Sequence, residues 1–359
     1  MPIDSNIRYR IKEHGHIKID DMMREALSTN NESYYKSTKT LGEEGDFITS
    51  PEISQLFGEI IALWAIEKWQ TLGSPKSFAL IELGPGRGKL MQDFLKVAKL
   101  DSKFYAAIEI FLHEINPFFI DLQKANLIEH NKSISWIKNI EEIPKIPAIF
   151  IANEFFDALP IKQYIKVKTK WFESTLVTDP VDGRIKFNKI ELHKALQKQL
   201  LSEHKNAKDG AIIEESIESL NIVRKLSKHI QKYTGAALII DYGYNIYSSE
   251  RSRKQYNSTL QAIKNHQYSS IIDTLGEADL TAHVDFNALS KAAREQNIKN
   301  IAYGTQKDLL LKYGIELRLE SLKNNLSQED FSIIEKQVFR LTSTRQMGEL
   351  FKVLELLKI

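Results

Sequence analysis

An apolar run that ends in a glycine-rich turn and leads into an amphipathic helix restricts the fold of this chain more than any other feature. It reads SFALIELGPGRGKLMQDFLKVAKL and occupies residues 77–100. Three further apolar runs follow, KFYAAIEIFLHEI, ISWIKNI and AIFIANEFF, with room for a helix between them. Because strands that alternate with helices are typical of parallel strands joined by crossovers, we expect a doubly wound α/β sheet.

The segments on either side of these strands predict additions to the sheet. Residues 17–27 and 52–72 repeat apolar residues at helical spacing, so two helices are expected before the first strand. After Pro160 the pattern changes to antiparallel strands and two helices, and AALIIDYGY at 236–244 returns to a buried strand. We predict an N-terminal helical region over residues 1–75 that packs on the core. The core itself is predicted in two parts, residues 76–160 and 236–359. Residues 161–235 between them are predicted to form an inserted α+β region for substrate or partner contacts.

Charge and composition exclude several classes of protein. The 49 Lys and Arg against 47 Asp and Glu leave a net charge of +2, too little for a general nucleic-acid binder. The absence of cysteine excludes disulfides and thiolate ligands, and we predict no metal site. The first residues do not resemble a signal peptide, and no apolar run approaches the roughly 18 residues of a membrane span. We expect a cytoplasmic chain that does not span a membrane, and its oligomeric state stays open, a homodimer included.

The glycine turn itself predicts a ligand site. Gly84, Gly86 and Gly88 directly follow a strand, so the backbone can approach a ligand closely, while the next helix offers free N–H donors. The G-x-G-x-G spacing differs from the G-x-G-x-x-G dinucleotide motif, and Glu82 just before it would repel a pyrophosphate. A carboxylate in that place could instead bind a cationic amino-acid group. A purely structural glycine turn is the alternative.

This E-x-G-x-G-x-G pattern resembles motif I of the class I S-adenosylmethionine methyltransferases, in which the acid and the glycine loop hold the methionine part of the cofactor. An acid at the end of the second strand should then bind the ribose hydroxyls. Spacing favours Glu109, about 20 residues past the glycines, whereas Glu114 falls just before the INP turn at the carboxyl end of the strand. We choose Glu114 and interpret Glu109 as a solvent-facing strand residue.

Six motifs in order extend the resemblance along the chain. They read GDFITSPEISQLFGE, ELGPGRGKLMQDFL, ANEFFDALPIKQ, LIIDYG, TLQA with EADLTAHVDF, and RLTSTRQMGELFKVL. From about residue 17 to 355 they resemble the MidA family, the bacterial and mitochondrial relatives of complex I assembly factor seven. The resemblance implies a Rossmann-like class I methyltransferase core and S-adenosyl-L-methionine as cofactor. It also implies a protein substrate in respiratory complex I, since the mitochondrial branch is regarded as methylating an arginine there.

An arginine acceptor would require acids beside the cofactor. A guanidinium has a pKa above about 12 and is protonated at neutral pH, so methylation needs carboxylates that orient it and accept its proton. IANEFFDALP supplies Asn153, Glu154 and Asp157 directly after a strand. We predict that Glu154 and Asp157 position the acceptor and that Asn153 contacts cofactor or acceptor. The alternative is that Asp157 only caps a turn before Pro160.

Four more residues are predicted to contact the substrate. Asp46 and Glu52 lie on a loop that enters a helix, and by resemblance this segment borders the cofactor and substrate cleft. DLTAHVDF contributes His283 and Asp285. A lone histidine is more often structural than catalytic, so His283 is the weaker candidate for a base.

Two other functions stay open from the sequence alone. A methyltransferase for small molecules would have a closed pocket and no protein substrate. A complex I assembly chaperone would keep the fold without transferring methyl groups, so replacing Glu154 or Asp157 with alanine would leave its activity intact.

Overall fold

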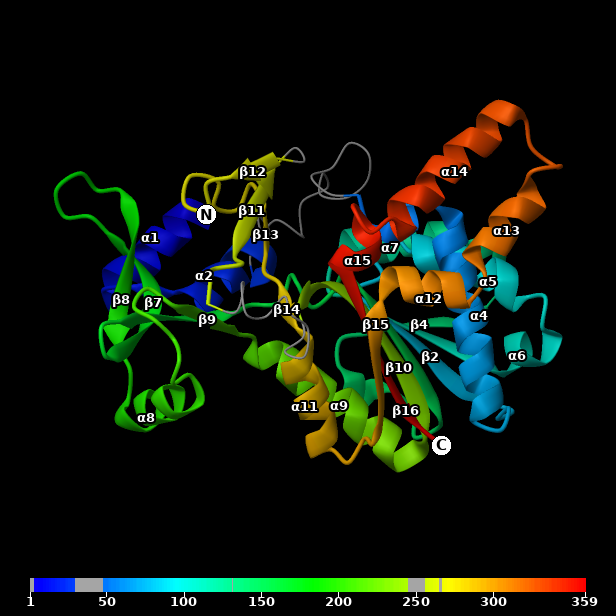
Figure 1. Cartoon of the computed structure of the whole chain (residues 1–359), viewed down its shortest axis with the longest axis horizontal. Coiled ribbons are helices and arrows are strands. Elements are labelled where there is room, and N and C mark those ends of the chain that lie inside the picture. Colours follow the sequence, from blue (N-terminus) through cyan, green and yellow to red (C-terminus); the bar gives the residue numbers. More distant parts are fainter. Residues whose placement is uncertain (1–2, 30–47, 131, 245–255, 265–266) are drawn as a thin grey trace.

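The computed structural model describes residues 3–29, 48–130, 132–244, 256–264 and 267–359. Within these ranges Figure 1 shows two lobes side by side, a core lobe around an eight-stranded sheet and a side lobe around two smaller sheets. The N-terminal end lies in the side lobe and the C-terminal end in the core lobe (Figure 1). The lobes are therefore built from interleaved parts of the sequence.

The core sheet is mostly parallel and confirms the predicted doubly wound arrangement. Its order is β15-β16-β10-β5-β2-β3-β4, with β14 paired to β10, and of the strands described only β16 runs against its neighbours. The first strand of the core sheet in the sequence is β2, which lies in the middle of the sheet. The next strands, β3 and β4, lie on one side of β2, and then β5 and β10 lie on the other side. Open α/β sheets bind ligands at such a switch point, here between β2 and β5. The strands are β2 (Phe78–Leu83), β3 (Ile108–His113), β4 (Ile134–Ile137), β5 (Ala148–Asn153), β10 (Gly235–Tyr244), β14 (Val284–Asp285), β15 (Asn300–Thr305) and β16 (Phe351–Lys358).

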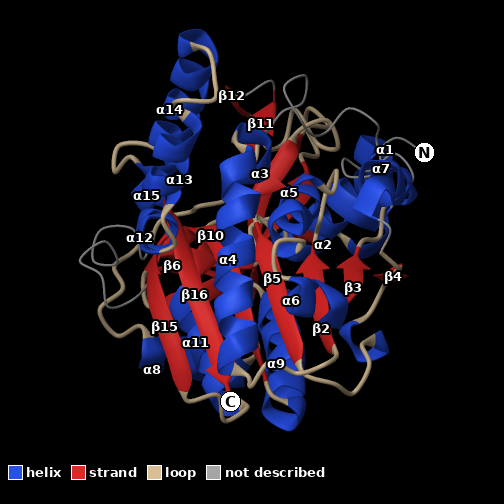
Figure 2. Cartoon of the chain, turned by 90° about the vertical axis from the view of Figure 1, so that its right-hand side faces the viewer, coloured by secondary structure: helices blue, strands red, loops and turns tan. Residues whose placement is uncertain are grey.

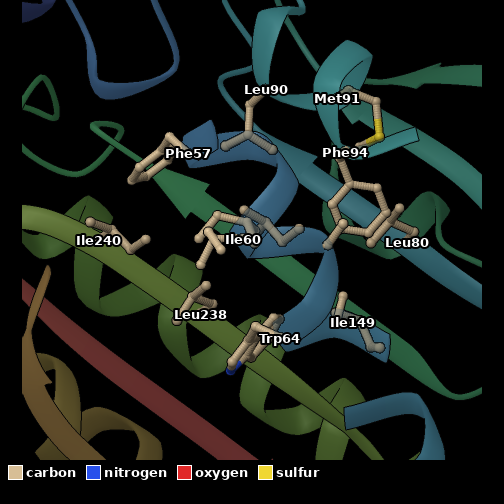
Figure 3. Packing of buried hydrophobic residues seen from close by; sticks show 14 of the residues in the cluster. Phe57, Ile60, Trp64, Leu80, Leu90, Met91, Phe94, Ile149, Leu238 and Ile240 are labelled. Carbon is tan, nitrogen blue, oxygen red and sulfur yellow. The ribbon is translucent and has the colours of Figure 1, made fainter. Parts of the chain in front are cut away.

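Helices cover both faces of the core sheet (Figure 2). The central strand β2 is buried at every position, as an apolar run covered on both sides should be. Leu80 belongs to the apolar cluster drawn in Figure 3, which includes Phe57 and Trp64 of α4, whereas Ile81 packs in the cluster of the opposite face with Val223 of α9. The helices of the core lobe are α3 (Ser50–Ile53), α4 (Gln55–Thr71), α5 (Lys89–Ala98), α6 (Ser102–Ala107), α7 (Pro117–Leu127), α9 (Ile217–Tyr233), α11 (Phe286–Glu295), α12 (Gln306–Lys312), α13 (Ile315–Leu322), α14 (Gln328–Thr342) and α15 (Met347–Leu350).

The side lobe joins three separate stretches of the sequence. Its larger, antiparallel sheet has the order β1-β7-β6-β9 with β8 paired to β7, and its smaller sheet has the order β12-β11-β13. Ile7, Met22, Leu176 and Leu280 from four of its elements pack in one apolar cluster. Its elements are α1 (Ile3–His14), β1 (Ile17–Lys18), α2 (Ile19–Arg24), β6 (Lys162–Val167), β7 (Lys170–Thr178), β8 (Ile185–Glu191), α8 (Lys194–Glu203), β9 (Ile212–Glu215), β11 (Gln261–Lys264), β12 (Gln267–Ser269) and β13 (Asp279–Thr281).

The observed packing differs from the predicted division in three places. The first is that β11, β12 and β13 lie in the side lobe, although residues 236–359 were predicted to belong to the core. The N-terminal region predicted over residues 1–75 is split, because residues 3–29 pack in the side lobe and only α3 and α4 pack on the core sheet. The insertion predicted over residues 161–235 ends earlier, because α9 buries Val223 against the core sheet. The crossover from β5 to its parallel neighbour β10 needs a helix on the sheet face, and α9 is that helix.

Candidate active site

A cavity of about 760 Å³ opens where β2, β3 and β5 end, at the switch point of the core sheet. This volume falls within the roughly 300–1,000 Å³ of small-molecule sites. The side lobe contributes to its wall: Arg24, at the end of α2, lines the cavity with its Nη2 atom 3.8 Å from Oε2 of Glu218 on α9. The cavity therefore lies between the two lobes.

The glycine turn after β2 forms one wall of the cavity. Gly84 and Gly86 line it with φ angles of 65° and 52°, which residues other than glycine rarely adopt. A Cβ atom at Gly84 would lie 2.7 Å from Cδ2 of Phe155, so a side chain would also clash. Gly88 is not among the described residues that line the cavity; it is the N-cap of α5 and packs against Gln123.

Glu82, the acid before the glycines, is buried at the end of β2 and lines the cavity. Its Oε2 atom has no hydrogen-bond partner among the described residues. Burial, followed by the charge of the nearby Glu114, raises the pKa of Glu82 to about 8. Because a buried polar atom normally has a partner, this oxygen is suited to a ligand that donates a hydrogen bond or carries positive charge.

Glu114, chosen for the end of the second strand, also lines the cavity. Its Oε1 accepts from the backbone N–H groups of Ile115 and Asn116, each at 2.8 Å. Burial raises the pKa of Glu114, while these N–H groups act in the opposite direction. Glu109, the alternative, is exposed on β3 and bonds to the hydroxyl of Ser77. The geometry therefore favours Glu114 over Glu109 as a ligand-facing acid.

The end of β5 brings Asn153, its last residue, and Glu154, the next residue, to the same cavity. Glu154 has a φ angle of 49°, an uncommon value for a residue with a side chain, and its N–H donates to the carbonyl of Ile240 at 2.9 Å. Its Oε1 accepts from the backbone N–H of Ser50 at 2.8 Å and from Nδ2 of Asn153 at 3.0 Å. Burial raises the pKa of Glu154 to about 7, with the Ser50 N–H opposing. The Oδ1 atom of Asn153 has no partner among the described residues.

Asp157 is buried and lines the cavity, and its backbone N–H donates to a second buried acid, Asp241. Oδ2 of Asp241 accepts from the N–H groups of Phe156 at 2.9 Å and Asp157 at 3.2 Å, and its Oδ1 accepts from the N–H of Tyr242 at 2.9 Å. Burial raises the pKa of Asp157 to about 6, and the nearby Tyr242 hydroxyl acts in the opposite direction. The distance and angle of a hydrogen bond to this hydroxyl are not met by any described residue. Oδ1 of Asp157 has no partner among the described residues either.

The buried acids next to this segment disfavour one another's charged forms. Burial, with repulsion from Asp157 and Glu154, raises the pKa of Asp241 well above its ordinary value. Interacting acids of this kind share protons as a group. The group can therefore both hold a cation and take up a proton.

Of the four residues predicted to contact the substrate, one lines the cavity, one lies outside the described residues, and two are not among the described residues that line the cavity. Glu52 lines the cavity from α3, and Asp46 lies outside the described residues. His283 and Asp285 are not among the described residues that line the cavity. His283 packs edge-to-face against Tyr242, with ring centroids 5.4 Å apart, and Asp285 caps α11 by accepting from the N–H groups of two residues in its first turn.

Sequence reasoning missed three residues that shape the site. Asp241 supports Asp157 from β10, Asp279 of β13 is buried and lines the cavity, and Gln123 of α7 contacts the glycine turn. The signal for Asp241 was an acid within the apolar run LIIDYG, and Asp279 belongs to the quoted motif EADLTAHVDF. An acid in a buried strand requires a partner, which is a sufficient reason to examine it. Gln123 carries no such signal.

Three residues that line one cavity, Glu82, Asn153 and Asp157, thus each carry a buried acceptor oxygen without a partner among the described residues. Such a site favours ligands with cationic or N–H donor groups. No group of three His, Asp or Glu side chains in the described part of the chain is arranged to hold a metal ion.

Comparison with known proteins identifies relatives over nearly the whole chain. The model of a family described as S-adenosyl-L-methionine-dependent methyltransferase matches residues 60–303. Protein arginine methyltransferase NDUFAF7, mitochondrial, of Xenopus laevis is 32% identical over an alignment of 375 positions, which covers 97% of this chain and 82% of that protein. The Homo sapiens protein of the same name is 30% identical, over 99% of this chain and 83% of that protein.

A solved structure has the same fold. The crystal structure of a protein from Burkholderia thailandensis, bound to S-adenosyl-homocysteine, superposes with a TM-score of 0.84 at 23% identity and covers 99% of this chain and 92% of that chain. At this identity the likeness concerns the fold alone. It confirms the predicted Rossmann-like methyltransferase sheet.

The expected cytoplasmic location is contradicted by these relatives. The proteins from Xenopus laevis and Homo sapiens are both mitochondrial by name. The prediction came from the lack of an apolar leader, and composition cannot distinguish compartments that share the same chemistry. In the described residues, no helix combines the length and the apolarity needed to cross a membrane.

Proposed function

Because the chain belongs to the family of S-adenosyl-L-methionine-dependent methyltransferases, we propose that it methylates an arginine side chain of another protein. The cofactor, S-adenosyl-L-methionine, follows from the family. The arginine acceptor is supported by the relatives named as protein arginine methyltransferases.

One observation carries the proposal. Three residues that line the cavity carry a buried acceptor oxygen without a partner among the described residues: Glu82 near the end of β2, Asn153 at the end of β5, and Asp157 in the segment that follows β5. Each of these oxygens would remain unsatisfied without a donor from a ligand, which is costly inside a protein. A cofactor with an ammonium group and an acceptor with a guanidinium would supply donors to these oxygens.

The residues present fit the cofactor. We assign Glu82 to its ammonium group, the backbone of Gly84 and Gly86 to its methionine part, and Glu114 to the ribose hydroxyls. A cation beside Glu82 would favour the charged carboxylate, whereas burial and the charge of Glu114 raise the pKa of Glu82 to about 8 without a ligand. When bound, the cofactor supplies an electrophilic methyl group.

Glu154 and Asp157 would act on the acceptor. A protonated guanidinium offers five N–H donors, and two acids at the end of β5 can orient it and localise its charge. The nitrogen that gains a methyl group must lose a proton, and these acids are the groups that would take it. Their raised pKa values, about 7 for Glu154 and about 6 for Asp157, make them better proton acceptors than ordinary carboxylates.

We also propose that the substrate is a subunit of respiratory complex I. The support is the resemblance of six motifs to the family of complex I assembly factor seven. A homodimer stays a prediction that light scattering tests, since one chain has a mass of 41.3 kDa.

The test is methyl transfer to a lysate from cells that lack this protein. The purified chain is incubated with methyl-labelled cofactor, and labelled products are identified by mass spectrometry. We expect label on an arginine of one or a few proteins, and a loss of about 100-fold or more in Asp157→Asn. The control is Glu191→Gln, an exposed acid on β8 in the side lobe. Label only on small molecules, or no transfer despite cofactor binding, would contradict the proposal.

A further inference from the structure

A buried amide connects two parts of the cofactor site. Gln123 lies on α7 with none of its surface exposed, although glutamine is usually found at protein surfaces. Its Nε2 donates to the carbonyl oxygen of Gly86 at 2.6 Å and to Oε2 of Glu114 at 3.3 Å. Its Oε1 accepts from Nε1 of Trp136 at 2.7 Å. Both polar atoms of this side chain are therefore bonded.

The partners determine the orientation of this amide. An indole N–H can only donate, so the amide oxygen of Gln123 must face Trp136. The NH₂ group then faces two acceptors, Gly86 and Glu114, with one hydrogen for each. The opposite orientation would place a donor against a donor and leave both acceptors without a partner.

The two acceptors belong to different elements of the sheet. Gly86 lies in the turn after β2, and Glu114 follows β3. Gln123 also supports the turn by packing, since a Cβ atom at Gly88 would lie 3.2 Å from Cγ of Gln123. Its amide acts with the backbone N–H groups of Asn116 and Ile115 against the effect of burial on the pKa of Glu114. One side chain thus favours both the position and the charge of Glu114.

We propose that Gln123 is a positioning residue for the cofactor, whose amide holds the Glu114 carboxylate at a set distance from the glycine turn. The ribose and the methionine part of the cofactor are then bound by one rigid unit, because Gln123 joins the glycine turn to the segment of Glu114. The inference rests on the proposed cofactor role of Glu114 and Gly86. Gln123 itself is not among the described residues that line the cavity, so it acts through them.

The test is the affinity for S-adenosyl-homocysteine, measured by calorimetry. Gln123→Met keeps a similar volume and removes both donors, so we expect the dissociation constant to rise about tenfold or more. The control is Gln92→Met, because the side chain of Gln92 on the neighbouring α5 donates instead to the backbone carbonyl of Asn126 at 3.2 Å. Its dissociation constant should change less than about twofold.

A double-mutant cycle separates positioning from general loss of packing. If Gln123 acts through Glu114, the loss of affinity in the variant with both Gln123→Met and Glu114→Gln should be smaller than the sum of the two single losses. Gln123→Glu is the second variant if the methionine variant does not fold. It keeps an acceptor for the Trp136 N–H but places a carboxylate oxygen beside Glu114 in place of a donor. It should therefore weaken the binding of S-adenosyl-homocysteine. Additive losses, or wild-type affinity in the Gln123 variants, would overturn the inference. A wild-type chain that binds no S-adenosyl-homocysteine would instead overturn the proposed function.

Discussion

The Oε1 atom of Glu154 accepts a hydrogen bond at 2.8 Å from the backbone N–H of Ser50, although 104 positions separate the two residues in the sequence. The bond joins the end of β5 to the start of α3. The hydroxyl of Ser50 in turn donates to Oε1 of the fully buried Gln306 at 3.1 Å. Glu154 thus has two roles, as an acid in the cavity and as the residue that holds α3 against the sheet.

Two substitutions at Glu154 should separate these roles. Glu154→Gln keeps an oxygen for the Ser50 N–H but loses the charge, so methyl transfer should fall about 100-fold or more while stability changes little. Glu154→Ala loses both, and should also lower the free energy of unfolding by about 1–3 kcal/mol because a partly buried N–H loses its partner. Transfer assays and urea unfolding measure the two effects. Full transfer in Glu154→Gln would exclude a role for this charge.

Glu82→Gln should stabilise the ligand-free protein at high pH. Burial raises the pKa of Glu82 from 4.5 to about 8, so over that range the folded state holds a proton that the unfolded state has lost. The free energy of unfolding therefore falls as the pH rises from about 4.5 to about 8. Glutamine has no proton to lose, so the Tm should be about 2 °C or more above wild type at pH 9 and little changed at pH 5.

Thermal melts of ligand-free protein at the two pH values check this prediction. The control is Glu109→Gln, which removes an exposed acid from the next strand, β3. A gain of equal size at both pH values, or the same gain in the control, would show that burial of Glu82 is not its cause.

Gly84→Ala should weaken cofactor binding without unfolding the chain. The new Cβ atom would lie 2.7 Å from Cδ2 of Phe155, and φ is 65°, so the turn must shift away from the cavity wall. We expect affinity for S-adenosyl-homocysteine to fall about tenfold or more. Gly183→Ala is the matched control, because Gly183 has a φ of 71° and nothing within 4 Å of its Cβ position. Equal affinity in both variants would place the cofactor elsewhere.

Asp241→Asn should reduce methyl transfer more than cofactor affinity. Asp241 accepts from the backbone N–H groups of Phe156, Asp157 and Tyr242, and an amide has only one oxygen for these donors. The loop that carries Asp157 should loosen, with a loss of about 1–3 kcal/mol in unfolding free energy. Calorimetry measures cofactor affinity, and transfer assays measure activity. The control variant in both is Asp101→Asn, which changes an acid that accepts from two N–H groups at the start of α6. A parallel loss in both assays would contradict a role in positioning Asp157.

Local patterns predicted much of the site because the fold brings strand ends together. Glu82, Glu114, Asn153 and Asp157 each follow or end an apolar run, and the carboxyl ends of parallel strands meet at one edge of a sheet. Finding the strands was therefore enough to gather these residues, without knowledge of any long-range contact. The same reasoning misplaced residues 3–29, because an amphipathic helix shows that it has an apolar face but not which sheet covers it.

The sequence by itself determined the alternation of strands and helices, the glycine turn after the first strand, and the acids at the strand ends, because each depends on neighbouring residues only. The tertiary structure decided how these groups are supported. Asp241 meets the segment of Asp157 because β10 pairs with β5 in the register that sets Ile240 beside Asn153. Gln123 meets Glu114 and Gly86 because α7 packs behind the turn. Such contacts depend on which elements become neighbours, and that choice is made by burial of apolar surface over the whole chain.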